Sequence, residues 1–330
     1  MRSVVYGAGA IGSVLGAKLH RAEQDVVLVA RPNHANAINE NGLRVSGIEE
    51  YVVDVAASVS PETVKGADIV FLTVKTQDTK DAVEEFTPHL GDSTPVVSLQ
   101  NGVQNPEIMS AIIGKERVIP GVVRFMASYL KPGEVEHTWD GNCIIGELSG
   151  VITDRIKRVS EYLSSAIETQ SSTNIEGELW TKLILNLINI PLALTGLSFP
   201  FGFRDNHLRL ITESAWSEGY AVVKAAGIKA DYRDLDMWIG LIKDESKLNP
   251  FLSQLPPDTR VHPSTHQALV RGSTDESDYL TGEIIRLGKR IGMGTPINTV
   301  LMRELQDIRQ GEALEYIQPE NLWQTIKDSK

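Results

Sequence analysis

The first half of the chain alternates short apolar runs with stretches in which apolar residues recur at helical spacing. The runs at 4–6, 25–30, 68–74 and 95–99 have the length and composition of strands buried on both faces of a parallel sheet. The stretches between them are typical of crossover helices. This order predicts a doubly wound α/β sheet.

Strand-like runs continue at 118–125, around Val135 and at 143–146. We expect them to extend the same sheet, the last two as a hairpin-like pair. Asp154 can then cap a helix that runs to about Ile167.

Beyond the short polar stretch 169–173 the pattern becomes helical and stays so. We therefore place the joint there and expect an α/β domain at 1–170 and an all-α domain at 171–330. Further helices are expected at 208–226, 235–242, 278–291 and 297–310.

A glycine-rich segment follows the first apolar run directly and opens the first helical stretch. Its GxGxxG spacing allows a tight turn, a close approach of the backbone to a pyrophosphate, and close packing of the helix, whose N-terminus adds partial positive charge. The second strand follows at the spacing of a βαβ unit, which a glycine-rich turn alone would not require. We predict a Rossmann-type dinucleotide site formed by Gly7, Ala8, Gly9, Ala10, Ile11 and Gly12.

Arg31 stands at the end of the second strand, where an acidic residue would bind the ribose 2′-hydroxyl of NAD. A guanidinium can pair instead with the 2′-phosphate of NADP. We therefore predict NADP(H) as the cofactor, the alternative being a surface arginine that points to water.

Polar residues follow the next two strands at their carboxyl ends, the edge at which open α/β sheets bind ligands. Lys75 and Gln77 come after one strand, and Gln100, Asn101 and Gly102 after the other. We assign Lys75, Gln77 and Asn101 to cofactor binding. The alternative for the Asn-Gly pair is a turn selected for its backbone.

The segment 178–189 is apolar enough to be buried but carries a polar stripe. At about 100° per residue, Glu178, Lys182, Asn186 and Asn189 fall within roughly 80° of one another. A buried ammonium needs a partner. Either Glu178 pairs with Lys182 on a solvated ridge, or the stripe faces a ligand. Pro191 should kink or end this helix a little beyond Asn189.

Composition bears on partners and compartment. A net charge of -11 over 330 residues argues against a nucleic-acid or anionic-membrane surface. The apolar run 183–197 is interrupted and falls short of the about 20 residues that span a bilayer. The single cysteine, Cys143, cannot form an internal disulfide, and we expect it to be buried in a protein of the reducing cytoplasm. We predict no metal site.

With these stretches in order, the sequence resembles the ketopantoate reductase family, the 2-dehydropantoate 2-reductases, nearly end to end. Further matching residues are Ser264, Arg271-Gly272, Glu276-Ser277-Asp278-Tyr279 with Gly282, and Gly292-Met293-Gly294-Thr295-Pro296. The resemblance implies NADPH-dependent reduction of 2-dehydropantoate to pantoate, a step of pantothenate and coenzyme A biosynthesis. It implies Lys182 and Glu276 as catalytic residues, and as substrate-binding residues Asn101, Lys182, Asn186, Ser264 and Glu276.

These side chains suit that chemistry. Hydride transfer to a ketone builds negative charge on the carbonyl oxygen, so a cation or acid must lie against it. Lys182 can stabilise the charge and donate the proton, with Asn186 one turn away to orient it. Glu276 can accept a hydrogen bond from a substrate hydroxyl, and Ser264 can bind the carboxylate.

Two positions depart from the family's pattern. Ile190 stands where the family usually carries an asparagine, with Asn189 one residue earlier, and Ala268 stands where an acid is common. The departures bear on the choice of 2-oxo acid more than on the reaction. The alternatives are a relative that acts on another small 2-oxo or β-hydroxy acid and a non-catalytic NADPH-binding sensor. The oligomeric state stays open, a homodimer included.

Overall fold

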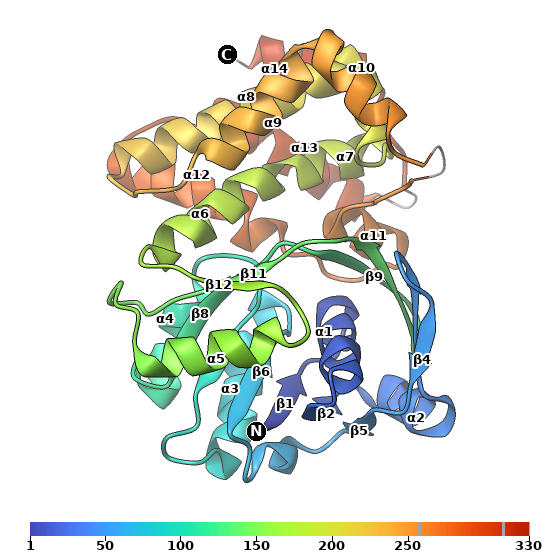
Figure 1. Cartoon of the computed structure of the whole chain (residues 1–330). Helices are drawn as coiled ribbons and strands as arrows, with labels where there is room; N and C mark the ends of the chain where they lie inside the picture. Colours follow the sequence, from blue (N-terminus) through green and yellow to red (C-terminus); the bar gives the residue numbers. More distant parts are fainter. Residues whose placement is uncertain (257–258, 312–313, 330) are drawn as a thin grey trace. The chain divides into compact units, whose positions relative to one another are not determined.

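The computed structural model describes residues 1–256, 259–311 and 314–329. The chain separates into two compact units, Met1–Ile175 and Glu176–Lys330 (Figure 1). The first combines sheets with helices and the second is helical, which confirms the predicted fold class. The polar stretch 169–173, at which the joint is predicted, contains β12 (Thr169–Ser171), an edge strand of the first unit's large sheet.

The large sheet has eight strands in the order β12-β11-β8-β7-β6-β1-β2-β5. All neighbours pair in parallel except β11 and β8, which are antiparallel. The chain runs outward from β1 through β2 to β5 and then crosses to β6 on the other side of β1. This reversal places the switch point between β1 and β6, and such sheets bind ligands at the carboxyl ends of the strands there. The strands besides β12 are β1 (Arg2–Tyr6), β2 (Asp25–Val29), β5 (Ala56–Ser58), β6 (Ile69–Leu72), β7 (Val96–Ser98), β8 (Val118–Val123) and β11 (Cys143–Ile145).

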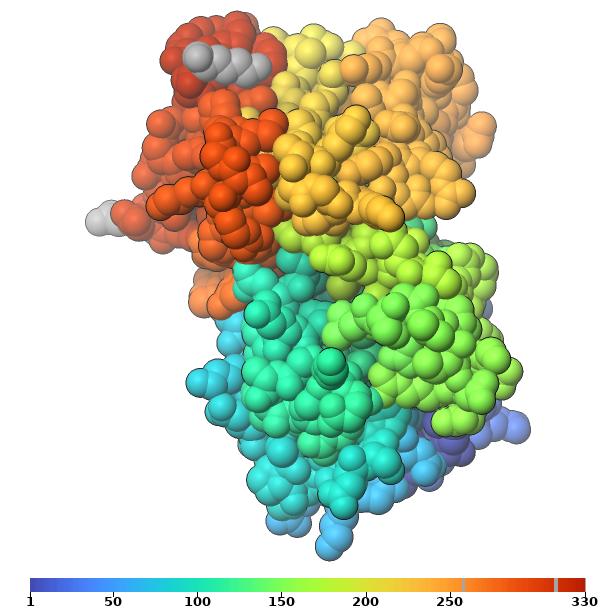
Figure 2. Space-filling view, turned by 90° about the vertical axis from the view of Figure 1, so that its left-hand side faces the viewer, coloured from blue at the N-terminus to red at the C-terminus, as the bar shows by residue number. Residues whose placement is uncertain are grey.

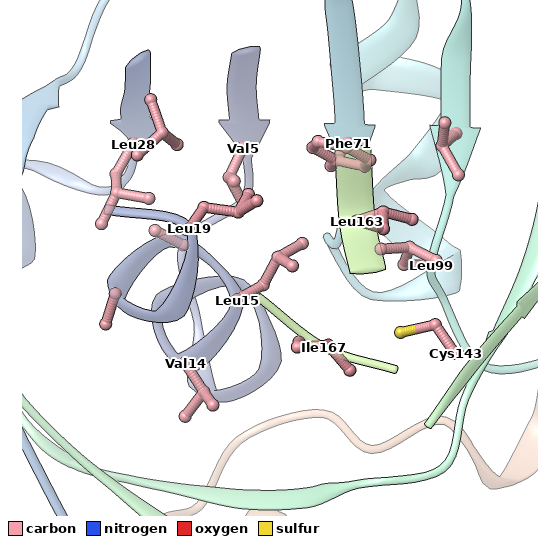
Figure 3. Close-up of a cluster of buried hydrophobic side chains, with 14 of the residues drawn as sticks. Val5, Val14, Leu15, Leu19, Leu28, Phe71, Leu99, Cys143, Leu163 and Ile167 are labelled. Atoms are coloured by element: carbon pink, nitrogen blue, oxygen red, sulfur yellow. The ribbon is translucent and has the colours of Figure 1, made fainter. Parts of the chain in front are cut away.

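Helices cover both faces of this sheet because successive strand residues point to opposite sides. Val5 lies with Leu15 and Phe71 in the core beneath α1 (Ala10–Arg21) and α5 (Asp154–Ser164) (Figure 3). Its neighbour Val4 faces a second core, which includes Phe86 and Met109 from α3 (Thr79–Phe86) and α4 (Asn105–Ile113). The predicted both-face burial of the strands is confirmed.

Cys143 lies in the first of these cores, as predicted (Figure 3). It is fully buried, and burial raises the pKa of its thiol to about 12. Such a thiol is not a nucleophile near neutral pH. The remaining helical elements of this unit are α2 (Pro32–Asn41) and the 3₁₀ turns η1 (Pro61–Val64), η2 (Thr76–Asp78) and η3 (Thr87–His89).

The strand around Val135 was wrongly placed in the large sheet. It belongs to a separate four-stranded sheet, in which β10 (Glu134–Trp139) pairs with β9 (Met126–Lys131) and β3 (Leu43–Gly47), and β3 with β4 (Tyr51–Val53). The hairpin is β9–β10, because Pro132-Gly133 supplies the turn, with Gly133 at φ 78°. α1 contacts strands of both sheets (Figure 1). A second correction concerns α5, whose cap is Thr153, since its Oγ1 accepts the Ile156 N–H, and not Asp154.

Every regular element in the described part of the second unit is a helix, apart from an isolated bridge between Phe199 and Val261. The C-terminal helices α12 to α14 pack against α8, and Figure 2 shows the red and orange segments beside the yellow ones. None of the helices in the described residues is both long and apolar enough to cross a membrane. The elements are α6 (Ile175–Leu185), η4 (Asn186–Ile188), α7 (Asn189–Thr195), η5 (Phe201–Arg204), α8 (Asn206–Ala225), α9 (Arg233–Lys243), α10 (Glu245–Ser253), α11 (Ser264–Val270), η6 (Ser277–Tyr279), α12 (Thr281–Ile291), α13 (Pro296–Gln310) and α14 (Pro319–Asp328).

The helix break near Pro191 lies earlier than expected. α6 ends at Leu185, the turn η4 follows, and Pro191 sits in the first turn of α7. A proline removes the hydrogen bond to the carbonyl four residues before it and crowds that carbonyl, so the ladder fails at Leu187 and not after the proline. The 3₁₀ turn η4 absorbs this change between the two helices.

Candidate active site

The glycine loop connects β1 to α1, and its three glycines have different steric environments. Gly7 has φ 99°, and a Cβ there would lie 2.7 Å from the backbone nitrogen of Val74. A Cβ on Gly12 would clash with the Thr73 hydroxyl and lie 2.8 Å from the Gly7 carbonyl oxygen. For Gly9, the nearest described atom is 3.9 Å away. Protein packing therefore requires the first and third glycines, whereas the second has space on its ligand side.

The start of α1 suits an anion. Gly9 is the N-cap, no side chain of the described residues caps the helix, and its first turn has no acidic residue. The amide groups of Gly7 and Ala8 donate to the Val29 carbonyl at 2.9 and 2.8 Å, which fixes the loop against β2. Uncapped helix N–H groups and the helix dipole attract a phosphate. The residues present fit the pyrophosphate of a dinucleotide.

Arg31 follows β2 and occupies the N-cap position of α2. Its side chain is 92% exposed, and its Nη2 atom lies 3.9 Å from Asp78 Oδ2. An ion pair this long and exposed contributes little to stability. The guanidinium can therefore exchange that contact for a ligand phosphate at small cost.

Lys75 and Gln77 follow β6, and Asn101 follows β7, so the structure brings these three to one edge of the sheet. Lys75, Gln77 and Asn101 are half-buried there. Gly102 has φ 87°, so the Asn-Gly pair also has the turn backbone that the alternative interpretation required.

A buried polar network, which the sequence analysis missed, fixes the backbone of this edge. The Asn101 carbonyl accepts hydrogen bonds from Thr76 Oγ1 at 2.8 Å and Asn105 Nδ2 at 2.6 Å. Gln100 is 7% exposed and donates to the Val74 carbonyl at 2.9 Å and to Thr79 Oγ1 at 2.7 Å. Gln100 therefore supports the edge from within. The sequence signal that could have indicated this network is the set of polar residues that follow β6 and β7.

In the second unit, the four residues of the predicted polar stripe lie on three successive elements, with Glu178 and Lys182 on α6, Asn186 in η4 and Asn189 at the start of α7. Glu178, Lys182, Asn186 and Asn189 are half-buried. Of the apolar residues of the segment, Leu179, Trp180, Leu183, Ile184 and Leu187 are buried, whereas Leu185 and Ile188 are half-buried.

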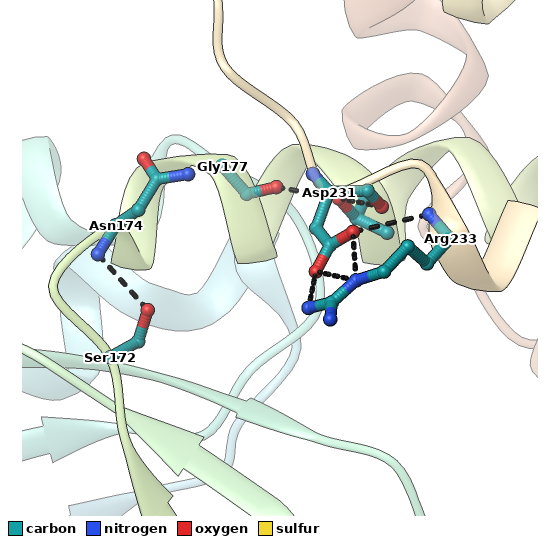
Figure 4. Close-up of polar contacts among 6 residues, drawn as sticks. Ser172, Asn174, Gly177, Asp231 and Arg233 are labelled. Carbon is teal, nitrogen blue, oxygen red and sulfur yellow. Dashed lines mark hydrogen bonds and ion pairs between the residues drawn. The ribbon is translucent and has the colours of Figure 1, made fainter.

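Thr181 anchors the first turns of α6 to the segment before α9. Its Oγ1 donates to the Gly177 carbonyl at 2.8 Å and accepts the Asp231 N–H at 2.8 Å. Asp231 in turn binds the guanidinium of Arg233 (Figure 4). Lys182 is therefore attached to a helix whose position is fixed by a neighbouring side chain.

The segments that carry Ser264 and Glu276 are also neighbours. Ser264 is the exposed first residue of α11, and Glu276, 7% exposed, precedes η6. The hydroxyl groups of Thr265 and Ser277 lie 3.2 Å apart and join the two segments. The structure thus brings the segments of Ser264 and Glu276 together, whereas Lys182 and Asn186 lie on another segment of the same unit.

The sheet topology and the glycine loop define a Rossmann-type nucleotide-binding protein with a helical second unit. A family model described as "Ketopantoate reductase PanE/ApbA" matches residues 3–150, and its "C terminal" companion matches residues 174–309. The chain belongs to the ketopantoate reductase family, whose members are nicotinamide-dependent reductases. This places it among the oxidoreductases that act on CH–OH groups.

Individual relatives match along nearly their full length. The chain is 29% identical over 312 residues to the 2-dehydropantoate 2-reductase of Archaeoglobus fulgidus, covering 94% of this chain and 98% of the relative. It is 33% identical, with a TM-score of 0.80, to the crystal structure of a PanE/ApbA family ketopantoate reductase from Ralstonia eutropha, covering 94% and 100%. A D-mandelate dehydrogenase with NADH and anilino(oxo)acetate shares the fold at a TM-score of 0.82 and 21% identity, covering 94% and 98%.

Proposed function

We propose that this protein reduces 2-dehydropantoate to pantoate with NADPH. The observation that carries the proposal is the pair Lys182 and Asn186, half-buried four positions apart on a largely buried segment, in a chain of this reductase family. A surface chosen only for solubility does not need a lysine and amides on one narrow ridge.

The proposed cofactor site lies in the first unit. The segment 7–12 takes the pyrophosphate, Arg31 the 2′-phosphate, and Lys75, Gln77 and Asn101 the part of the cofactor that reaches the edge of the sheet. The uncrowded face of Gly9 and the weak ion pair of Arg31 support this assignment. A shared fold with an NADH-containing dehydrogenase makes NAD(H) the competing cofactor.

The proposed substrate site lies in the second unit. The nicotinamide, when bound, supplies a hydride to the carbonyl carbon of the substrate. The Lys182 ammonium stabilises the charge that develops on the carbonyl oxygen and then donates a proton to it. Asn186 directs the ammonium, Ser264 binds the carboxylate, and Glu276 accepts from the substrate hydroxyl.

We place this reaction in the cytoplasm, on a small-molecule substrate and without nucleic acid or membrane. The burial of the single cysteine and the charge of -11 support this setting. A homodimer is compatible with the chain, and sedimentation of the purified protein measures its mass directly.

The test is NADPH oxidation by the purified protein with 2-dehydropantoate beside other 2-oxo acids. We expect the highest kcat/KM with 2-dehydropantoate. Lys182→Ala protein, folded and able to bind NADPH, is the control for a contaminating reductase. Higher kcat/KM with another 2-oxo acid would overturn the substrate assignment.

A different 2-oxo acid is the second candidate, and one observation favours it. Ile190 is 1% exposed and lies in the core, so position 190 presents no polar group to a ligand. Aromatic and branched 2-oxo acids therefore belong in the panel. NADPH binding with no turnover of any of them would instead indicate the non-catalytic sensor.

A further inference from the structure

Arg309, near the end of α13, contacts two points of the short segment that contains Glu276. Its Nη2 and Nε atoms lie 2.6 Å from Asp275 Oδ1 and 2.9 Å from Asp275 Oδ2. Its Nη1 atom lies 3.5 Å from Asp278 Oδ2. Arg309 therefore contacts the residue immediately before Glu276 and the residue two positions after it.

The pair formed with Asp275 is largely protected from water. The Asp275 side chain is 2% exposed and that of Arg309 is 25% exposed. Two parallel N–H to oxygen contacts fix the orientation of the carboxylate as well as its position. A buried carboxylate that loses its cation is strongly unfavourable, so the segment would have to rearrange without Arg309.

The same carboxylate orders the backbone that follows it. Asp275 Oδ1 accepts the Ser277 N–H at 2.7 Å, and Ser277 contacts Thr265, the residue after Ser264. The Glu276 carbonyl accepts the Tyr279 N–H at 2.9 Å. A continuous set of contacts thus runs from Arg309, around Glu276, to the start of α11.

Charge gives Arg309 a second role. Asp275, Glu276 and Asp278 place three acidic side chains within four positions, and the first two are buried. Like charges this close oppose one another unless a cation lies among them. Arg309 supplies such a cation, because it pairs with Asp275 and Asp278. Arg286 also lies nearby, but it donates to the Asp278 carbonyl at 2.7 Å and pairs with Glu283.

We infer that Arg309 is a positioning residue of the active site, which acts by fixing the direction of Glu276 and its spacing from Ser264. This inference rests on the proposed function. It assigns a role to a residue 33 positions from Glu276, on a different helix. Its side chain contacts Asp275 and Asp278, on either side of Glu276 and Ser277, so the inferred action is through Glu276.

The test is a double-mutant cycle with Arg309→Ala and Glu276→Gln, measured by kcat and KM for the 2-oxo acid and by the Kd for NADPH. We expect Arg309→Ala to lower kcat/KM about 100-fold, as misplacement of a catalytic group does, and to leave the Kd for NADPH unchanged. Because Arg309 acts through Glu276, the double variant should be no slower than Glu276→Gln alone. Arg309→Lys should recover only part of the activity, since an ammonium cannot make both contacts.

Arg303→Ala is the matched control, because Arg303 is an exposed residue of the same helix that pairs only with its neighbour Glu304 among the described residues. Losses that multiply in the double variant, or Arg309→Ala protein as active as the Arg303→Ala control, would overturn the inference. Full activity of Glu276→Gln would refute the site assignment itself. Hydrogen exchange of the 275–278 amides tests the contact apart from activity, and exchange unaffected by Arg309→Ala also refutes it.

Discussion

The glycine loop allows one substitution to be tested at two positions with opposite expected results. Gly9→Ala adds a methyl group that meets its nearest described atom, the Gly7 carbonyl oxygen, at 3.9 Å. Gly12→Ala adds one that clashes with Thr73 and lies 2.8 Å from that same oxygen. The first should impair cofactor binding, and the second should impair folding.

The magnitudes follow from these contacts. Overpacking a methyl group costs about 1–3 kcal/mol, so Gly12→Ala should lower Tm by about 3–10 °C in a unit of this size. An alanine at position 9 meets no such clash, so Gly9→Ala should lower Tm by less than Gly12→Ala does. The same methyl group displaces a pyrophosphate that approaches the backbone, and we expect a 10- to 100-fold weaker Kd, about 1.4–2.8 kcal/mol.

The assays are thermal unfolding without ligand and titration of the protein with NADPH. Gly240→Ala is the control, because its added Cβ has no described atom within 4 Å and lies in α9 of the second unit. That variant should be more stable by about 0.5–1 kcal/mol and bind NADPH normally. The reasoning is refuted if Gly9→Ala binds NADPH as tightly as the wild type, or if it loses as much stability as Gly12→Ala.

Three further predictions concern single residues. Lys182→Ala should lower kcat by about three decades with the Kd for NADPH unchanged, whereas Glu178→Ala should retain most of the turnover; equal effects on kcat would contradict the roles. Arg31→Ala should reduce the preference for NADPH over NADH by about one to two decades in kcat/KM, and a wild type with no preference would remove the basis for the assignment. His34 is buried, and burial lowers its pKa from 6.5 to about 4. Because protonation of the buried ring is unfavourable, about 3 kcal/mol of the free energy of unfolding is present above pH 6.5 and is lost as the pH falls through 4. His34→Gln should therefore flatten the fall of Tm between pH 6.5 and 4, and a slope equal to that of the wild type would count against it.

Short-range physics explains what the sequence alone determined. The dinucleotide loop, the buried parallel strands and the polar stripe at Lys182 each depend on steric or periodic rules within a few residues. The clash that requires glycine at positions 7 and 12 and the burial pattern around Lys182 both agree with those rules. Local patterns of this kind are present in the sequence before any tertiary contact forms.

Tertiary structure decided the features that depend on pairing between distant segments. Val135 pairs with Val45 in a second sheet, which no pattern near Val135 indicates. Gln100 supports the sheet edge because its amide donates hydrogen bonds to the Val74 carbonyl and to Thr79 at the start of α3, both of which belong to another segment of the chain.

The same applies to Arg309, whose partner Asp275 lies 34 positions earlier in the chain. The sequence shows an arginine near the end of an amphipathic helix and an acid in a polar loop, both of which are ordinary surface features. Only the packing of α13 in the second unit brings them together, because the free energy of a buried ion pair depends on its surroundings and geometry. Residue types and spacing therefore determined which side chains are candidates for chemistry, whereas the fold determined which side chains orient them.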